Sequence, residues 1–149
     1  MGFTKVCLDT NIIIYYLNNK ELVTTNINNF ISLSGEVFIS RFVDLEILRG
    51  FHFKENNLRY VTYINFRENL SILELTDVGS NIYLELYREV IRMGINKKDV
   101  DHFDILIASS AIEQNLPLVT NNQKDFVLAQ KRFPHFNTLN WYDQKISFG

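Results

Sequence analysis

Short apolar runs alternate with longer amphipathic segments along the whole chain. Short runs bounded by polar residues are typical of buried strands, and five are predicted, at Phe3–Leu8, Glu36–Ser40, Ser71–Leu75, Leu116–Thr120 and Asn137–Trp141. Apolar residues spaced three and four apart predict helices at Thr10–Leu17, Glu21–Ser34, Asn56–Asn69, Asp77–Met93 and Asp101–Asn115, with one more that Ser40 caps and that includes Gly50. This alternation predicts a three-layer α/β/α fold with a four- to five-stranded, mostly parallel sheet.

Composition indicates one globular domain over residues 1–149. The chain is 46% hydrophobic and 21% charged, with only 6 Gly and 2 Pro, which is typical of a folded protein rather than a disordered one. No apolar run reaches the roughly 18 residues that span a bilayer, so no membrane association is expected. Cys7 is the single cysteine and lies within an apolar strand. We expect it to be a small buried side chain in a cytoplasmic protein.

Four acidic residues fall close to the ends of predicted strands. Asp9 directly follows the first strand, and Glu46 lies on the helix after the second. Asp104 is in the first turn of an apolar helix that leads into the fourth strand, and Asp125 lies just past that strand. In a parallel sheet covered by helices, ligands bind at the carboxyl ends of the strands. The topology therefore predicts that the four carboxylates meet at one edge of the sheet.

Each of these acids also has a structural explanation, as a helix cap or as half of an ion pair. The arrangements are Asp9 at the cap of the helix from Thr10, Glu46 with Arg49, Asp101 with Asp104, and Asp125 at the cap of Phe126–Gln130. These structural explanations do not remove the energetic cost of clustering the carboxylates, which repel one another and raise one another's pKa. Mg²⁺ or Mn²⁺, which prefer oxygen ligands, would remove that cost. No Cys–His set is available for zinc.

The net charge also constrains the function. At −2, it argues against a nucleic-acid binder with a broadly basic surface. It does not argue against a nuclease, because acids that hold a cation count toward the total while the bound ion reverses their local effect.

Three sequence blocks resemble the PIN domain, in particular the VapC-type toxins of toxin–antitoxin pairs. They are "LDTNIIIYYL", "FVDLEILRG" and "DHFDILIASSAIEQNLPLVTNNQKDF", followed by a terminal strand. The similarity spans nearly the whole chain. The third block is the most specific part, with an Asp, apolar residues and small residues leading into "LPLVTNN" and "DF".

The resemblance implies a metal-dependent endoribonuclease that cleaves RNA with Mg²⁺ or Mn²⁺. Its first three acids correspond to Asp9, Glu46 and Asp104. Some relatives carry a fourth acid where this chain has the neutral Asn122, so Asp125 is assigned as the fourth. Supporting positions correspond to Thr10, Asn11 and Thr120, with Asn122 as a weaker ligand and Asp101 as an extra acid. The resemblance also implies a homodimer and a small cognate antitoxin.

Two other functions remain open from the sequence. One is a PIN-like binding module without catalysis, which the neutral Asn122 keeps open. The other is a haloacid dehalogenase-type phosphatase with Asp9 as nucleophile, although that family wants a second Asp where this chain has Asn11. Further hypotheses concern phosphate contacts (Arg41, Arg49, Lys97, Lys98, Lys124), proton transfer (His102) and a partner surface (Phe42, Phe51, Phe53, Tyr60).

Overall fold

Five strands form one sheet in the computed structural model, which describes residues 2–51 and 57–148. They are β1 (Lys5–Leu8), β2 (Glu36–Ser40), β3 (Ser71–Leu73), β4 (Leu118–Val119) and β5 (Thr138–Leu139), in the order β3-β2-β1-β4-β5. Every neighbouring pair is parallel. The predicted fold class is confirmed, with five strands and a fully parallel sheet.

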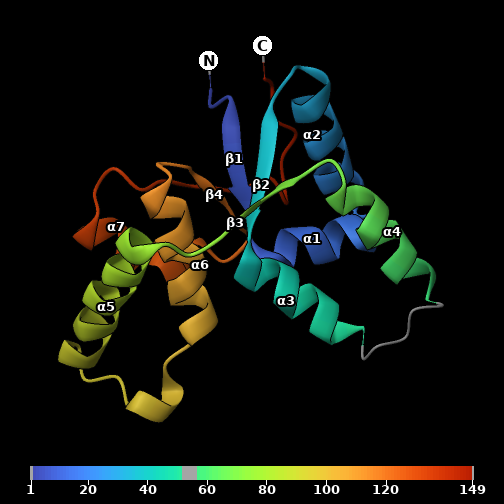
Figure 1. The fold of residues 1–149 in the computed structure, drawn as a ribbon. Helices are drawn as coiled ribbons and strands as arrows, with labels where there is room; N and C mark the ends of the chain where they lie inside the picture. The colour runs from blue at the N-terminus through green and yellow to red at the C-terminus, as the bar shows by residue number, and fades with distance from the viewer. Residues whose placement is uncertain (1, 52–56, 149) are drawn as a thin grey trace.

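The helices cover both faces of this sheet (Figure 1). They are α1 (Thr10–Leu17), α2 (Glu21–Ser32), α3 (Arg41–Gly50), α4 (Leu58–Arg67), α5 (Asp77–Arg92), α6 (His102–Glu113) and α7 (Val127–Arg132). Helices α5, α6 and α7 lie to one side, and α1, α2 and α4 to the other. Short 3₁₀ turns, η1 (Lys97–Asp99) and η2 (Gln123–Phe126), precede α6 and α7. None of the described helices has the length and apolar character needed to cross a membrane.

Most predicted boundaries agree with the structure, and the strands are the main exception. β1 begins at Lys5 instead of Phe3, and β3, β4 and β5 are shorter than predicted. β4 begins only after Pro117, which has no N–H to donate to a ladder, although its carbonyl accepts the Cys7 amide at 2.9 Å. The predicted start of one helix at Asn56 lies outside the described residues.

The residue in the left-handed C′ position at the end of α2 is Ser34, with φ of 67°, and not the glycine that follows it. The amides of Ser34 and Gly35 donate to the carbonyls of Ile31 and Phe30 at 3.0 and 2.9 Å, which is a Schellman motif. Glycine is needed at position 35 for space, because a Cβ there would lie 2.3 Å from the Phe30 ring.

The central strand, β1, is buried over its last three residues and ends at the candidate site. Val6, Cys7 and Leu8 are 0% exposed. The pKa of the Cys7 thiol is raised to about 12, mainly by burial and also by the nearby charge of Asp9. A thiol with so high a pKa is a poor nucleophile, in agreement with its expected structural role. The carboxyl ends of β1 and β2 point toward α1 and α3 (Figure 1).

Candidate functional site

Asp9 lies between the end of β1 and the start of α1, and it serves both elements. Its Oδ1 accepts the amide of Thr10 at 2.8 Å, so the predicted cap is present. Its Oδ2 accepts the hydroxyl of Thr120 at 2.8 Å and the side-chain amide of Asn11 at 3.2 Å. Asp9 is only 4% exposed. The Asp9 carboxylate can therefore cap α1 and at the same time lie at the carboxyl edge of the sheet.

A network of hydrogen bonds connects the ends of β1 and β4 around the Asp9 carboxylate. The Oγ1 of Thr120 accepts the side-chain amide of Asn11 at 3.3 Å and the backbone amide of Asn122 at 3.0 Å. The Oδ1 of Asn11 accepts the backbone amide of Asn121 at 3.1 Å. Sequence reasoning did not single out Asn121, although it directly follows Thr120. These contacts fix the orientation of Asp9 by hydrogen bonds from α1 and from the residue that follows β4.

Glu46 faces the same edge from α3. Its Oε1 accepts the hydroxyl of Thr10 at 2.8 Å, which connects it to the residue that follows Asp9. Among the ion pairs of the described residues, none joins Glu46 to Arg49. The Arg49 guanidinium instead lies over the Phe103 ring, 5.2 Å from its centroid. The expected Glu46–Arg49 pair is therefore wrong, and Glu46 keeps carboxylate capacity for another partner.

Asp101 and Asp104 begin α6, and Asp125 lies in η2. Asp101 caps α6 by accepting the Asp104 amide at 3.2 Å, as the capping pattern predicted. The expected cap at Asp125 is absent in the described chain, because α7 begins at Val127 without a side-chain cap. Asp104 and Asp125 together line a small cavity of about 50 Å³ between α5, α6 and α7. Helix capping therefore does not explain the presence of an acid at position 125.

The charges of these acids act on one another. The pKa of Asp104 is raised to about 7, mainly by burial and in addition by the charges of Asp101, Asp9, Asp125 and Glu46. Such an influence of all four requires that they lie near Asp104, since charge interactions weaken with distance. In the structure, the predicted acids are therefore close enough for their charges to interact.

The same coupling acts on the other two half-buried or buried acids. Burial raises the pKa of Asp9, and the charges of Asp125 and Asp101 add to this, while hydrogen bonds from Thr120 and Thr10 oppose it. Burial also raises the pKa of Glu46, with a hydrogen bond from Thr10 opposing it and the charge of Asp9 adding to it. These are the shifts expected for acids gathered without a neutralising cation.

The donor set fits a hard divalent cation in its chemistry. All the acids offer carboxylate oxygens, which Mg²⁺ and Mn²⁺ prefer. In the arrangement described, no group of three or more His, Cys, Asp or Glu side chains within residues 2–51 and 57–148 is already placed to hold a metal ion. The acids are neighbours, and side-chain movement would be needed to bring their oxygens around one ion.

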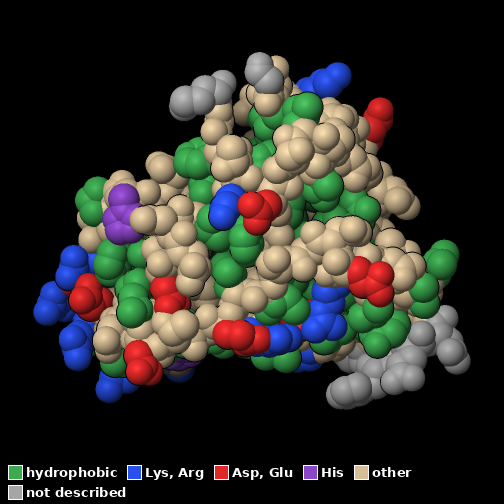
Figure 2. Space-filling model, turned by 45° about the horizontal axis from the view of Figure 1, so that its top comes forward, with side chains coloured by type: hydrophobic (Ala, Val, Ile, Leu, Met, Phe, Trp, Pro, Cys, Tyr) green, Lys and Arg blue, Asp and Glu red, His purple; other side chains and the backbone are tan. Residues whose placement is uncertain are grey.

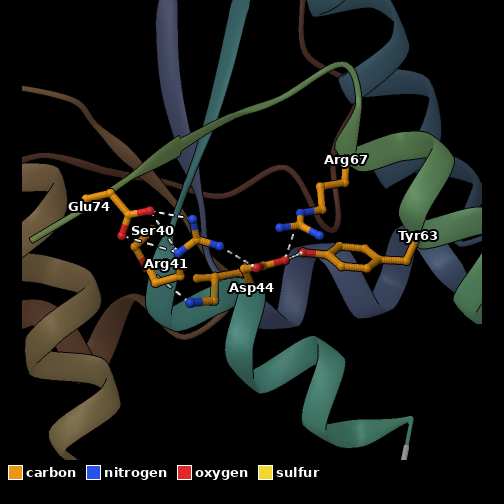
Figure 3. A network of polar contacts seen from close by, with 7 residues as sticks. Ser40, Arg41, Asp44, Tyr63, Arg67 and Glu74 are labelled. Carbon is orange, nitrogen blue, oxygen red and sulfur yellow. Dashed lines mark hydrogen bonds and ion pairs between the residues drawn. The ribbon is translucent and has the colours of Figure 1, made fainter. Parts of the chain in front are cut away.

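A buried charge network anchors α3, and sequence reasoning missed it. Asp44 is 1% exposed and accepts the Tyr63 hydroxyl at 2.8 Å. Nη1 of Arg41 lies 3.0 Å from one carboxylate oxygen of Asp44, and Nε of Arg67 lies 3.2 Å from the other. Arg41 also pairs with Glu74 just beyond β3 (Figure 3). Arg41 is therefore engaged by two carboxylates within the protein.

Metal-free protein should lose stability as the pH rises from about 5 to about 8. The raised pKa of Asp104, about 7, means that the folded state holds a proton that the unfolded state has already released in this range. Stability therefore falls with rising pH. Urea unfolding in EDTA at several pH values measures this, and Asp104→Asn should flatten the profile. A stability that rises from pH 5 to pH 8 would refute the charge coupling.

Comparison with known proteins places this geometry in a family. The PIN domain model matches residues 6–132. "Ribonuclease VapC2" of Rickettsia felis is 30% identical over 135 residues, covering 90% of this chain and 96% of the relative. "Ribonuclease VapC" of Rickettsia bellii is 32% identical over 140 residues, covering 89% and 92%.

Solved structures agree with the sequence relatives. A chain in the crystal structure of VapBC2 from Rickettsia felis bound to a DNA fragment from its promoter has a TM-score of 0.75 at 29% identity, covering 92% of this chain and 98% of that one. A chain of DNA-bound VapBC from Salmonella typhimurium has a TM-score of 0.71 at 25% identity, with the same two coverages. Because the matched span takes in every strand but the last, this chain belongs to the PIN domain family.

Proposed function

We propose that this protein is an endoribonuclease that hydrolyses RNA phosphodiester bonds with Mg²⁺ or Mn²⁺, and that it is the toxin of a type II toxin–antitoxin pair. The observation that carries the proposal is the mutual influence of acids from four different segments, all of which raise the pKa of Asp104. The ribonuclease names of the full-length relatives support the reaction type. The VapBC structures support the pairing with an antitoxin.

In this proposal, Asp9, Glu46, Asp104 and Asp125 hold the cation. When bound, such an ion lowers the pKa of a water and offsets charge on the reacting phosphate. Thr10 is the shared support, because its hydroxyl donates to Glu46 and its amide to Asp9. These bonds limit rotation of the two carboxylates, so the oxygens that face the substrate stay in place.

The remaining residues assigned to the site have lesser roles. Thr120 and Asn11 orient Asp9 by donating to its second oxygen. Asp101 keeps α6 capped and adds negative charge at the edge of the site. We assign Asn122 as a weaker ligand or substrate contact, next to the backbone that Thr120 holds.

The rival functions fit these contacts less well. A phosphatase of the haloacid dehalogenase type needs an acid–base group two residues after its nucleophile, and here Asn11 is tied by hydrogen bonds to Asp9, Thr120 and Asn121. A binding module without catalysis has no need to keep four acids whose repulsion is unfavourable.

Cleavage of RNA is the direct test of the proposal. Purified protein incubated with a labelled RNA that has unpaired and paired regions should cut it in Mn²⁺ or Mg²⁺ and stop when EDTA is in excess. Products resolved on a denaturing gel measure internal cuts. Cutting that continues undiminished in EDTA would refute the metal dependence. Absence of any cutting of either region, in either metal, would refute the nuclease.

The antitoxin surface is also part of the proposal, and the structure changes where we place it. Phe51 is buried, and Phe42 and Tyr60 pack partly into the core, so they are not the exposed surface expected from the sequence. Phe53 lies outside the described residues. Exposed apolar side chains on α1, α3 and α4 instead include Ile14, Leu45, Leu58 and Val61. Of these, Ile14 lines a groove of about 290 Å³ between the three helices, and Glu46 also lines it.

A small antitoxin seated in this groove would cover apolar surface and reach the acid site at once. We retain the homodimer as part of the same proposal. The single cysteine is buried, which fits the reducing cytoplasm that the proposal assigns to the protein.

A further inference from the structure

Three aromatic rings lie close together beside the acid site. Tyr83 and Tyr87 on α5 have centroids 6.1 Å apart and planes within 17° of parallel. The His102 ring lies 5.7 Å from that of Tyr87 at 24°, and 6.1 Å from that of Tyr83 at 39°. The Tyr83 hydroxyl and His102 Nδ1 are 2.7 Å apart, which holds the imidazole in this orientation. We call these three residues the aromatic cluster.

The aromatic cluster adjoins the candidate metal ligands on both of its helices. His102 directly follows Asp101 and lies two residues before Asp104. On α5, Tyr87 directly follows Leu86, which lines the same small cavity as Asp104 and Asp125. A nucleotide whose phosphate lies at the acids therefore has the aromatic cluster within reach of its own or its neighbour's base.

The aromatic cluster is accessible to solvent and has basic neighbours. His102 is exposed, and both tyrosines are partly exposed. Lys97 and Lys98 in η1, five and four residues before His102, are also exposed. Packing α5 against α6 needs only apolar contacts of the kind that the buried Leu86 provides. Tyrosine and histidine rings that carry polar groups at the surface are instead typical of binding sites with an apolar side and a solvent-exposed side.

Electrostatics alone provides little affinity for RNA in this protein. The net charge is −2, and on the face shown in Figure 2 the Lys and Arg side chains alternate with Asp and Glu. Proteins that bind single strands add to phosphate contacts the stacking of bases on aromatic side chains, which tolerates many sequences. Double-stranded RNA keeps its bases stacked on one another and offers none to a protein ring.

We propose that the aromatic cluster of Tyr83, Tyr87 and His102 is a subsite on which an unpaired base of the RNA substrate stacks next to the cleaved phosphodiester. This rests on the proposed ribonuclease function and adds to it three residues that position the RNA strand by binding one of its bases. The base lies against the exposed part of the aromatic cluster, and Lys97 and Lys98 contact phosphates farther along the RNA strand.

The test uses the full-length protein and an unpaired RNA oligonucleotide that carries one 2-aminopurine. Stacking on an aromatic side chain quenches this base, so scanning it along the strand in EDTA reports the subsite without cleavage. We expect quenching at one position near the cut. Tyr87→Leu should abolish it and raise KM in Mn²⁺ about 5- to 100-fold with little change in kcat, whereas Tyr87→Phe should behave as wild type.

The control is Phe3→Leu, which removes an exposed ring just before β1, at the opposite end of the strand from the acids. If Tyr87→Leu unfolds, His102→Leu tests the same subsite. Cleavage with unaltered KM and no quenched position would overturn the subsite while the nuclease stands. Quenching without any cleavage would overturn the nuclease and leave base stacking supported.

Discussion

Replacement of Asp9 by Asn is expected to lower the rate of RNA cleavage at least about a thousandfold. The carboxylate is central to the proposed metal site, and Asn removes its charge and one of its two acceptor oxygens. A loss of about 4 kcal/mol of transition-state stabilisation corresponds to that factor. The variant should stay folded, because Asn can still accept the Thr10 amide as a helix cap. Initial rates in Mn²⁺, together with the melting temperature, measure both effects.

A matched control for this variant is Glu36→Gln. Glu36 begins β2, at the end of the sheet opposite the acids, and forms an exposed ion pair with Lys5. The same loss of a carboxylate there should leave cleavage unchanged. Full activity in Asp9→Asn would show that Asp9 is a helix cap only.

Replacement of Asp44 by Ala is expected to destabilise the protein by about 3 kcal/mol, the range seen when one partner of a buried charge network is removed. The side chain is 1% exposed. Its loss leaves the Tyr63 hydroxyl without its acceptor and Arg67 without its ion-pair partner. Arg41 retains Glu74. In Figure 3, Asp44 lies between the guanidinium groups of Arg41 and Arg67.

Urea unfolding of wild type and variant measures the change. Glu36→Ala should change stability by less than about 0.5 kcal/mol, because exposed ion pairs contribute little. Tyr63→Phe, which removes only the hydroxyl, should cost less than Asp44→Ala, at about 1 kcal/mol. Equal stability of Asp44→Ala and wild type would contradict the network as a structural element.

Part of the site could be predicted because its residues follow directly from strand ends. Asp9 and Thr120 each come one residue after a buried parallel strand, β1 and β4, and parallel strands end at one edge. The helix-start pattern likewise placed Asp101 and Asp104 correctly. These signals are local in sequence, so periodicity and capping rules find them.

Most of the Asp44 network could not be predicted, because only Arg41 lies on the same helix and the other two partners come from α4. In the sequence, Asp44 is one more acid in an amphipathic helix, and only packing of α4 on α3 brings Tyr63 and Arg67 to it. Asn26 is a similar case. It is fully buried and bonds through its side chain to the carbonyls of Trp141 and Gln144 near the end of the chain. Neither contact has a sequence spacing that a pattern could reveal.

The short strands β4 and β5 show another limit of sequence patterns. Apolar runs predicted β4 and β5 as five residues each, whereas only Leu118–Val119 and Thr138–Leu139 pair as strands. Hydrophobicity reports burial, and burial continues past the point where hydrogen-bonded pairing stops. Trp141, for example, lies beyond β5 and is 2% exposed.

Binding of Mn²⁺ to the metal-free protein tests most directly whether the separated acids form one cation site. Titration followed by the electron paramagnetic resonance signal of free Mn²⁺ gives the affinity and the number of ions. We expect wild-type protein to bind Mn²⁺, and each of Asp9→Asn, Glu46→Gln, Asp104→Asn and Asp125→Asn to bind it at least about tenfold more weakly. Wild-type protein that leaves Mn²⁺ free at millimolar concentration, or that binds it equally well after all four substitutions, would contradict a shared site.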